Sequence, residues 1–318
     1  MPAYRTNLFA GSGFPSCTIL AIAIVLGLSA CGCDNSGGVG RGVVGMFGET
    51  GLGWGDFLYP RAITASPESK IFVADKSGRI QRFDADGRYE TGWWMPDWKA
   101  GKPIGLTVHP DGRLFIADTH YSRVMIFDQD GTQLGSFGEQ GDGPGQFRLV
   151  TDIAIDDAGF IYVGEYGGND RVSKFSPDLE FVRFIGAEPV DGVRLSRPAG
   201  LAIDGDQTLW VADACNHRIV RFSLDGEYLM SFGSVGVEPG QLRFPYDIDV
   251  CRDGSLLVSE FSNNRLQWFD RAGKSLRIWG RGGREPGELY SPWGATEAAN
   301  GRLYVLDSVN NRVQIVKL

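Results

Sequence analysis

The stretch RPAGLAIDGDQTLWVADACNHRIVRF, residues 197–222, carries the pattern that decides the fold. A proline and a glycine precede an alternating apolar run, a polar turn follows, and a second run, LWVAD, ends in an acidic residue. After a short polar loop, an arginine opens a third alternating run, RIVRF. Alternation with a period of two is typical of β-strands, and clusters of Gly, Asp and Asn between such runs mark turns. The stretch therefore predicts three short antiparallel strands.

The same pattern occurs six times along the chain. Each copy has a run that ends in Asp or Glu, and successive acids are 43, 47, 48, 47 and 47 residues apart. These acids are Asp75, Asp118, Glu165, Asp213, Glu260 and Asp307. A proline stands 15 residues before five of them, with Val150 in the third copy, and an arginine follows each acid. Such a period with four strands per copy is typical of propeller blades, so we predict an all-β, six-bladed β-propeller of four-stranded blades.

The two ends of the repeat region predict how the ring closes. The last copy stops at its third strand, RVQIVKL. The missing fourth strand is found ahead of the first copy, where residues 44–60 match residues 134–147 of a complete copy. The N-terminal strand is therefore expected to pair with the last blade and leave no open edge in the ring.

The order Pro, Gly-apolar, VAD, Asn and RI or RV resembles the NHL repeat, most closely in residues 197–222. The resemblance covers about residues 43–318 and implies NHL-type blades. It is less specific for function, because the family includes scaffolds, sensor domains and lyases. Two functions stay open: a binding or scaffold module for a protein or small ligand, and a metal-assisted lyase or hydrolase resembling the peptidyl-hydroxyglycine amidating lyase.

Residues 1–30 differ from the rest in containing one basic residue and no acidic one. Their apolar run, residues 18–28, is shorter than the roughly 20 residues that span a bilayer, and it suits the core of a signal peptide. The run continues into LSAC, which resembles the bacterial lipobox and implies lipidation of Cys31.

The resulting division of the chain is a lipoprotein-type signal peptide over 1–30, a flexible Gly-rich tether over 31–42 and the propeller over 43–318. We expect the protein to be anchored by lipid to a bacterial envelope membrane, facing the periplasm or the exterior.

The composition limits the partners. The formal net charge is −8, and no run of Lys and Arg occurs, which excludes the clustered positive surface of a nucleic-acid-binding protein. The five cysteines include one in the signal peptide and Cys31, so too few remain for a disulfide framework. We expect a monomer that takes a protein or small-molecule partner and touches the membrane only through its lipid.

Asp213, Cys215 and His217 bring three chemically reactive residue types into one short segment. The acid recurs in every copy, whereas the cysteine and the histidine do not, so we interpret the segment as structural. The carboxylate is expected to accept N–H groups of the turn, with the arginine reaching it or the next blade. Cys215 and His217 are then variation specific to one blade. Left-handed turn positions are expected for Asn216, Asn263 and Asn310.

The axial tunnel is a second candidate site. The second and fourth residues after each proline position are expected to face the axis, and most are small. Asp152, Asp247 and Asp249 are exceptions that would place three carboxylates inside. Like charges at close range repel unless they are hydrated, protonated or bridged by a cation. A water-filled tunnel and a bound cation such as Ca²⁺ both stay open.

The three histidines of the chain do not predict a zinc site. His109 lies in a turn on one face of the disc, and His120 and His217 lie in loops on the opposite face. A three-histidine site of the kind that the lyase resemblance implies is therefore not expected.

The loops after the second strands differ from copy to copy, as in THYS, YGGND, ACNH and FSNN, whereas the turns on the opposite face are short and polar. These loops and the nearby crossovers carry aromatic residues, which are enriched among interface anchors. We predict ligand or partner binding on this loop face, centred on Tyr121, Tyr166, Phe261, Tyr246 and Trp293. The first copy also has a Trp-rich insertion, residues 92–101.

Lipidation can be tested at the cysteine itself. The Cys31→Ala variant is expected to accumulate as unprocessed precursor or to leave the membrane fraction, because the thiol that carries the lipid is missing. Cys33→Ala, two residues away, is the control and should be acylated normally. Radiolabelled fatty acid and membrane fractionation report both, and normal acylation of the Cys31 variant would reject the assignment.

Overall fold

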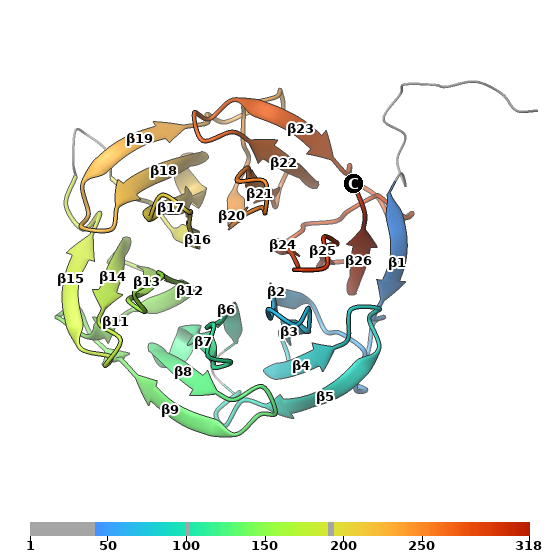
Figure 1. Ribbon diagram of the computed structural model, residues 1–318, viewed down its shortest axis with the longest axis horizontal. Coiled ribbons are helices and arrows are strands. Elements are labelled where there is room, and N and C mark those ends of the chain that lie inside the picture. The colour runs from blue at the N-terminus through green and yellow to red at the C-terminus, as the bar shows by residue number, and fades with distance from the viewer. Residues whose placement is uncertain (1–41, 100–101, 190–193) are drawn as a thin grey trace, which may run out of the picture. The chain divides into compact units, whose positions relative to one another are not determined.

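The computed structural model describes residues 42–99, 102–189 and 194–318. In these residues the strands form six four-stranded antiparallel sheets, arranged in a ring with one strand of each nearest the axis (Figure 1). The predicted all-β, six-bladed propeller is confirmed. Cys31, the signal peptide and nearly all of the expected tether lie outside the described residues.

The blades are numbered from the first proline, and each is given from its innermost strand outward. Blade 1 contains β2 (Pro60–Ala65), β3 (Ile71–Asp75), β4 (Arg79–Phe83) and β5 (Tyr89–Trp94). Blade 2 contains β6 (Pro103–Val108), β7 (Leu114–Asp118), β8 (Arg123–Phe127) and β9 (Gln133–Phe137). Blade 3 contains β12 (Leu149–Ile155), β13 (Ile161–Tyr166), β14 (Arg171–Phe175) and β15 (Phe181–Ile185).

The remaining blades follow the same plan. Blade 4 contains β16 (Pro198–Ile203), β17 (Thr208–Asp213), β18 (Arg218–Ser223) and β19 (Tyr228–Phe232). Blade 5 contains β20 (Pro245–Val250), β21 (Leu256–Glu260), β22 (Arg265–Phe269) and β23 (Ser275–Trp279). Blade 6 contains β24 (Gly294–Glu297), β25 (Leu303–Asp307), β26 (Arg312–Val316) and β1 (Val43–Phe47).

The N-terminal strand completes the last blade, as predicted. β1 pairs antiparallel with β26, from Val43 opposite Val316 to Phe47 opposite Val313. Figure 1 shows β1 on the outer side of β26, next to the C-terminus. The ring is thus closed by strands from opposite ends of the chain.

The hydrophobic core is divided among the blade interfaces. Each of six buried clusters takes its side chains from two neighbouring blades, including the pair formed by blades 6 and 1. The alternating strands of a blade therefore bury both faces, one against each neighbour. Stability in this fold is a sum of interfaces between neighbours.

The innermost strands share an irregularity close to their first residue. In five blades the register with the second strand shifts just after the proline position. A β-bulge of this kind re-aims a side chain. The alternation of inward and outward side chains, which the sequence interpretation counted from the proline, is therefore interrupted. The residue directly after the proline lies at the end of the tunnel.

The crossovers between blades are compact. One holds a parallel pair, β10 (Glu139–Gln140) with β11 (Gln146–Phe147), and three others have a single parallel bridge in the same place. Each buries an apolar side chain, namely Phe57, Phe147, Leu242 and Leu289. The helical segments are two single turns, η1 (Thr119–Tyr121) and η2 (Ala214–Asn216), and within the described ranges no helix is long and apolar enough to cross a membrane.

Ring closure can be tested within β1. Phe47 packs on Phe83 of blade 1 at 4.6 Å between ring centroids, whereas Val44 in the same strand is 57% exposed. Phe47→Ala should lower stability by about 2 kcal/mol or more, because it empties part of the interface between blades 6 and 1. Val44→Ala, the matched control, should change it by less than about 0.5 kcal/mol. Equal melting temperatures for the two variants would contradict this closure.

Candidate functional site

In blades 1, 3, 4, 5 and 6 the acid at the end of the second strand accepts a backbone N–H of the preceding crossover and so joins that crossover to its blade. Asp213 accepts the Ser196 N–H at 2.6 Å and the Arg218 Nε–H at 2.7 Å. The arginine also donates to the Arg194 carbonyl, which lies in the crossover. Equivalent acid–arginine pairs form at Asp75, Asp118, Glu165, Glu260 and Asp307. The structural role predicted for this acid and arginine is confirmed by their contacts.

The loop residue two before the arginine is not in the left-handed region, contrary to our expectation. The asparagine at this position instead donates to the strand-end carboxylate, in the pairs Asn216–Asp213, Asn263–Glu260 and Asn310–Asp307. The left-handed residue is the next one along. The asparagine side chain is engaged by the carboxylate three residues earlier, and the positive φ falls one position later than expected.

His217 occupies that left-handed position, with φ of 55°. Its Nδ1 accepts the Phe244 N–H of blade 5 at 3.1 Å. In the next two blades Asn264 and Asn311 accept the corresponding N–H of the following blade at 2.7 and 2.6 Å. Burial lowers the pKa of His217, which favours the neutral acceptor form. The interpretation of His217 as mere surface variation was wrong, because it links two blades, whereas Cys215 is exposed.

The inner strands line an axial cavity of about 260 Å³. At the second position after the proline, glycine and aspartate alternate around most of the ring, as Gly105, Asp152, Gly200, Asp247 and Gly294. A Cβ on Gly105 would lie 2.7 Å from Oδ1 of Asp152, and one on Gly294 would lie 2.9 Å from Oδ2 of Asp247. Each aspartate thus fills space that a neighbouring glycine leaves free.

The tunnel carboxylates bond sideways to the next blade. Asp152 accepts the Leu201 N–H at 2.9 Å, and Asp247 accepts the Ala295 N–H at 3.0 Å. Burial raises the pKa of Asp152 to about 7 and that of Asp249 to about 6. Burial, reinforced by the charge of Asp152, raises the pKa of Asp247 well above its usual value. All three carboxyl groups therefore keep their protons to a higher pH than an ordinary aspartate does.

Among the described residues, no group of three or more His, Cys, Asp or Glu side chains is placed to hold a metal ion. Asp152, Asp247 and Asp249 line one cavity, but they do not form the single set of ligands that the suggested Ca²⁺ site needs. His109 contacts Asp111 in its turn. It is thus separate from His217, which bridges blades on the loop face.

Four of the five predicted binding residues gather at the loop-face end of the tunnel, which we call the mouth. Tyr246 stacks on Phe261 at 4.6 Å and meets Trp293 edge-on at 5.2 Å. Tyr166 joins them through Arg197, whose guanidinium lies 4.9 Å from the Tyr166 ring and 4.8 Å from the Tyr246 ring. All these side chains are half-buried, so they form a recessed site.

Tyr121, the fifth predicted residue, packs differently. The guanidinium of Arg123, in the same blade, lies 4.9 Å from its ring centroid. Tyr121 belongs to blade 2. Tyr246 and Phe261 belong to blade 5 and Trp293 to blade 6, and these blades lie across the ring from blade 2 (Figure 1).

Arg61 and Arg197 at the mouth were missed by the sequence interpretation. Arg61 is the bulged residue after Pro60, and its guanidinium lies 5.0 Å from the Trp293 ring and 5.6 Å from the Tyr59 ring. Arg197 precedes Pro198 with φ of 58°. The available signal was position: a large side chain next to the repeat proline belongs at the tunnel end.

Two family models match stretches of the repeat region. A model of the NHL repeat matches residues 195–222, and a model described as 6-bladed beta-propeller matches residues 102–170. The chain is a six-bladed β-propeller of the NHL-repeat type. The human NHL repeat-containing protein 3 is 27% identical over 163 residues, which are 46% of this chain and 43% of that protein. The chain thus spans less than half of the curated relatives that it matches.

Solved structures show a similar fold at low identity. Virginiamycin B lyase from Staphylococcus aureus, solved with quinupristin, is 20% identical with a TM-score of 0.59, covering 85% of this chain and 88% of that one. A putative gluconolactonase is 16% identical with a TM-score of 0.63, covering 85% of this chain and 92% of that one. Such likeness shows the fold and leaves the activity open.

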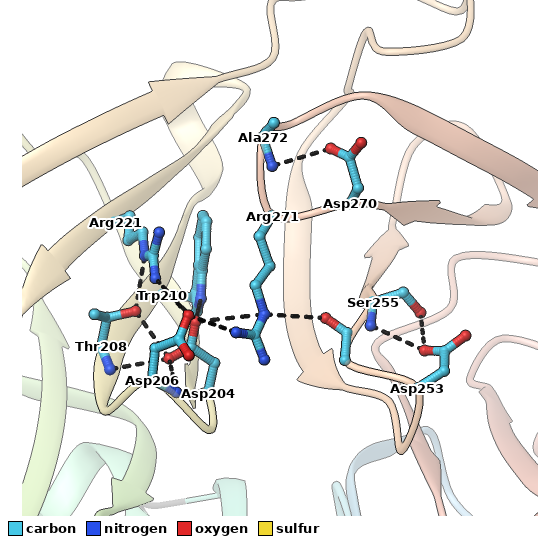
Figure 2. A network of polar contacts seen from close by, with 11 residues as sticks. Asp204, Asp206, Thr208, Trp210, Arg221, Asp253, Ser255, Asp270, Arg271 and Ala272 are labelled. Atoms are coloured by element: carbon cyan, nitrogen blue, oxygen red, sulfur yellow. Dashed lines mark hydrogen bonds and ion pairs between the residues drawn. The ribbon is translucent and has the colours of Figure 1, made fainter.

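The turn face of the NHL propeller is more connected than its simple polar turns suggested. Arg271 of blade 5 donates to Asp206 of blade 4 at 2.5 Å and lies 3.9 Å from Asp204 (Figure 2). Asp204 also accepts the indole N–H of Trp210 at 3.0 Å. Asp270 accepts the Ala272 N–H, which identifies an ordinary Asx turn. The turns on this face therefore help to join blades 4 and 5.

The Trp-rich insertion of blade 1 forms an exposed cluster on the rim of the NHL propeller. Trp94 is 43% exposed and lies 6.2 Å from Trp54 and 5.7 Å from Trp98. The buried Arg79 lies 5.8 Å from the rings of Trp54 and Trp94. Trp93 points the other way and packs on Phe127 of blade 2. This cluster is separate from the mouth and supplies control positions.

The raised pKa of Asp152 gives a pH test. Because the folded state keeps the proton up to about pH 7 and the unfolded state releases it near pH 4, stability is lost as pH rises between these values. Asp152→Asn keeps the shape without the titration, so it should melt at least about 3 °C above wild type at neutral pH and lose that advantage near pH 4. Exposed Asp178→Asn is the control. A gap that is constant with pH would contradict the assignment.

Proposed function

We propose that this NHL propeller is a binding module whose ligand enters the axial tunnel through the mouth on the loop face. The observation that carries the proposal is a recessed set of aromatic rings at the end of a cavity of about 260 Å³. Tyr246 and Trp293 line this cavity, Phe261 stacks on Tyr246, and Tyr166 joins them through Arg197. Apolar pockets with a few convergent polar groups are the usual form of small-molecule sites.

The recess favours a small ligand over a protein partner. Protein hot spots are contributed by anchors that project from an accessible patch, whereas the mouth residues are half-buried around a hollow. The exposed aromatic cluster of the propeller lies on the rim of blade 1 instead. In the same proposal, the lipid on Cys31 holds the propeller at an envelope membrane, where the mouth samples the periplasm or the exterior.

The lyase or hydrolase alternative has weaker support. It rests on the fold shared with virginiamycin B lyase and the putative gluconolactonase at 20% and 16% identity. The described side chains at the tunnel do not form a three-ligand metal group, and the mouth presents aromatic and guanidinium groups. This arrangement can hold a ligand, and it lacks a nucleophile paired with a base.

Binding at the mouth can be tested with N-phenyl-1-naphthylamine, a neutral dye that fluoresces in apolar sites. Trp293→Ala should weaken dye binding by about tenfold or more, because it removes one wall of the site. Trp94→Ala, which deletes an exposed tryptophan of the rim, is the matched control and should leave the affinity of the mouth for the dye unchanged. The proposal fails if the two variants bind the dye alike or if wild type shows no saturable site.

A further inference from the structure

Arg61 and Arg197 differ from the repeat arginines of the propeller. Each of the six repeat arginines is paired with the strand-end carboxylate of its blade. In the described part of the chain, neither mouth guanidinium is hydrogen-bonded or paired with a carboxylate, and Nε of Arg61 is buried without a partner. Their neighbours are the faces of Tyr59, Trp293, Tyr166 and Tyr246.

Such a pair is costly when the site is empty. A buried charge that lacks an ion-pair partner loses hydration that aromatic faces replace only in part. The two arginines also act on each other: burial lowers the pKa of Arg61, and the positive charge of Arg197 contributes in the same direction. Unpaired N–H groups that converge at a cavity provide donors for a ligand.

The groups around the pair counter its positive charge only in part. On the blade 2 side, burial and the charges of Arg61 and Lys102 lower the pKa of His120. The carboxylates that share the cavity are Asp152, Asp247 and Asp249, whose raised pKa values reduce their negative charge near neutral pH. The mouth is thus a local positive site in a chain of net charge −8.

We propose that Arg61 and Arg197 bind the anionic head group of a small organic ligand whose flat apolar body stacks against the rings of Tyr246 and Trp293. This inference rests on the proposed function and adds the ligand class to it. Guanidinium groups offer planar pairs of donors that match carboxylate, sulfonate and phosphate oxygens. The rings at the mouth supply flat apolar surface beside them.

The backbone explains why these two arginines reach the mouth. Arg61 lies at the bulge between Pro60 and Ala62, and Arg197 has a positive φ directly before Pro198. The Arg197 N–H is bound by Asp170 of blade 3 at 2.8 Å, which fixes the backbone that carries the side chain. Both guanidinium groups are therefore placed by the repeat framework.

The test compares two dyes that share a ring system. 8-Anilinonaphthalene-1-sulfonate carries a sulfonate, and N-phenyl-1-naphthylamine is its uncharged counterpart. Wild-type protein should bind the sulfonate about tenfold more tightly or better, since hydrogen bonds to charged groups are among the strong ones. The double variant Arg61→Gln with Arg197→Gln should remove this preference and leave the affinity for the neutral dye unchanged.

Matched variants separate the head-group effect from other causes. Arg88→Gln removes one positive charge from a side chain that is 78% exposed on the turn face, so it should keep the preference for the sulfonate. Arg61→Lys keeps the charge and loses the paired donors, and it should give an intermediate preference. Unchanged melting temperatures confirm that each variant is folded, and the single Gln variants serve if the double variant is not.

The outcomes distinguish the two proposals. The anion site is supported if the double variant loses the preference for the sulfonate dye and Arg88→Gln keeps it. If both dyes bind equally at a site that Trp293→Ala removes, the arginines do not select an anion, and the mouth remains a binding site. If neither dye depends on Trp293, the proposed function itself is overturned. Competition by benzoate but not by inorganic phosphate would show that the apolar body is needed beside the anion, and the reverse result would contradict the stacking.

Discussion

The fold depends on a buried carboxylate at the end of each second strand. In blade 4, Asp213 binds an incoming crossover N–H, an asparagine amide and the Arg218 guanidinium at the same time. A buried ion pair contributes little net stability, but it is strongly unfavourable to leave half of it unpaired. The pair therefore fixes where the chain enters a blade relative to where its second strand ends. The acid–arginine pair recurs in all six blades, so the same local constraint acts at each position around the ring.

The sequence was sufficient for the blades, their order and the closing strand, because these follow from a repeated pattern and a period of two. It placed Tyr166, Tyr246, Phe261 and Trp293 on one face for the same reason, and they gather at one mouth. Positions that depend on backbone irregularity were harder to predict from the sequence. The left-handed residue was misplaced by one position, since the loop completes a helical turn first.

The arginines of the mouth were hidden for a different reason. Arg61 and Arg197 flank repeat prolines and so look like part of the framework. Their distinguishing property is that, among the described residues, neither guanidinium is paired with a carboxylate, and this depends on distances between blades. The tunnel aspartates show the converse case. The alternation of Gly105, Asp152, Gly200, Asp247 and Gly294 is visible in the sequence, but only the close approach of inner strands shows that aspartate occupies volume left by glycine.

The pairing of β1 with β26 has a consequence for how the molecule is made. Val43 lies opposite Val316, so the first described strand pairs with the last described one, which is synthesised much later. Blades 1 to 5 contain only contiguous strands and can form in the order of synthesis, whereas β1 must wait for its partner until β26 has been made. The entropic cost of joining such distant segments rises only slowly with the length of the loop between them, and preformed blades shorten the effective loop further. Completion of the ring is therefore a single late event that distinguishes a chain containing β26 from one truncated before it, and a nascent chain that stalls before β26 exposes two sheet edges at once.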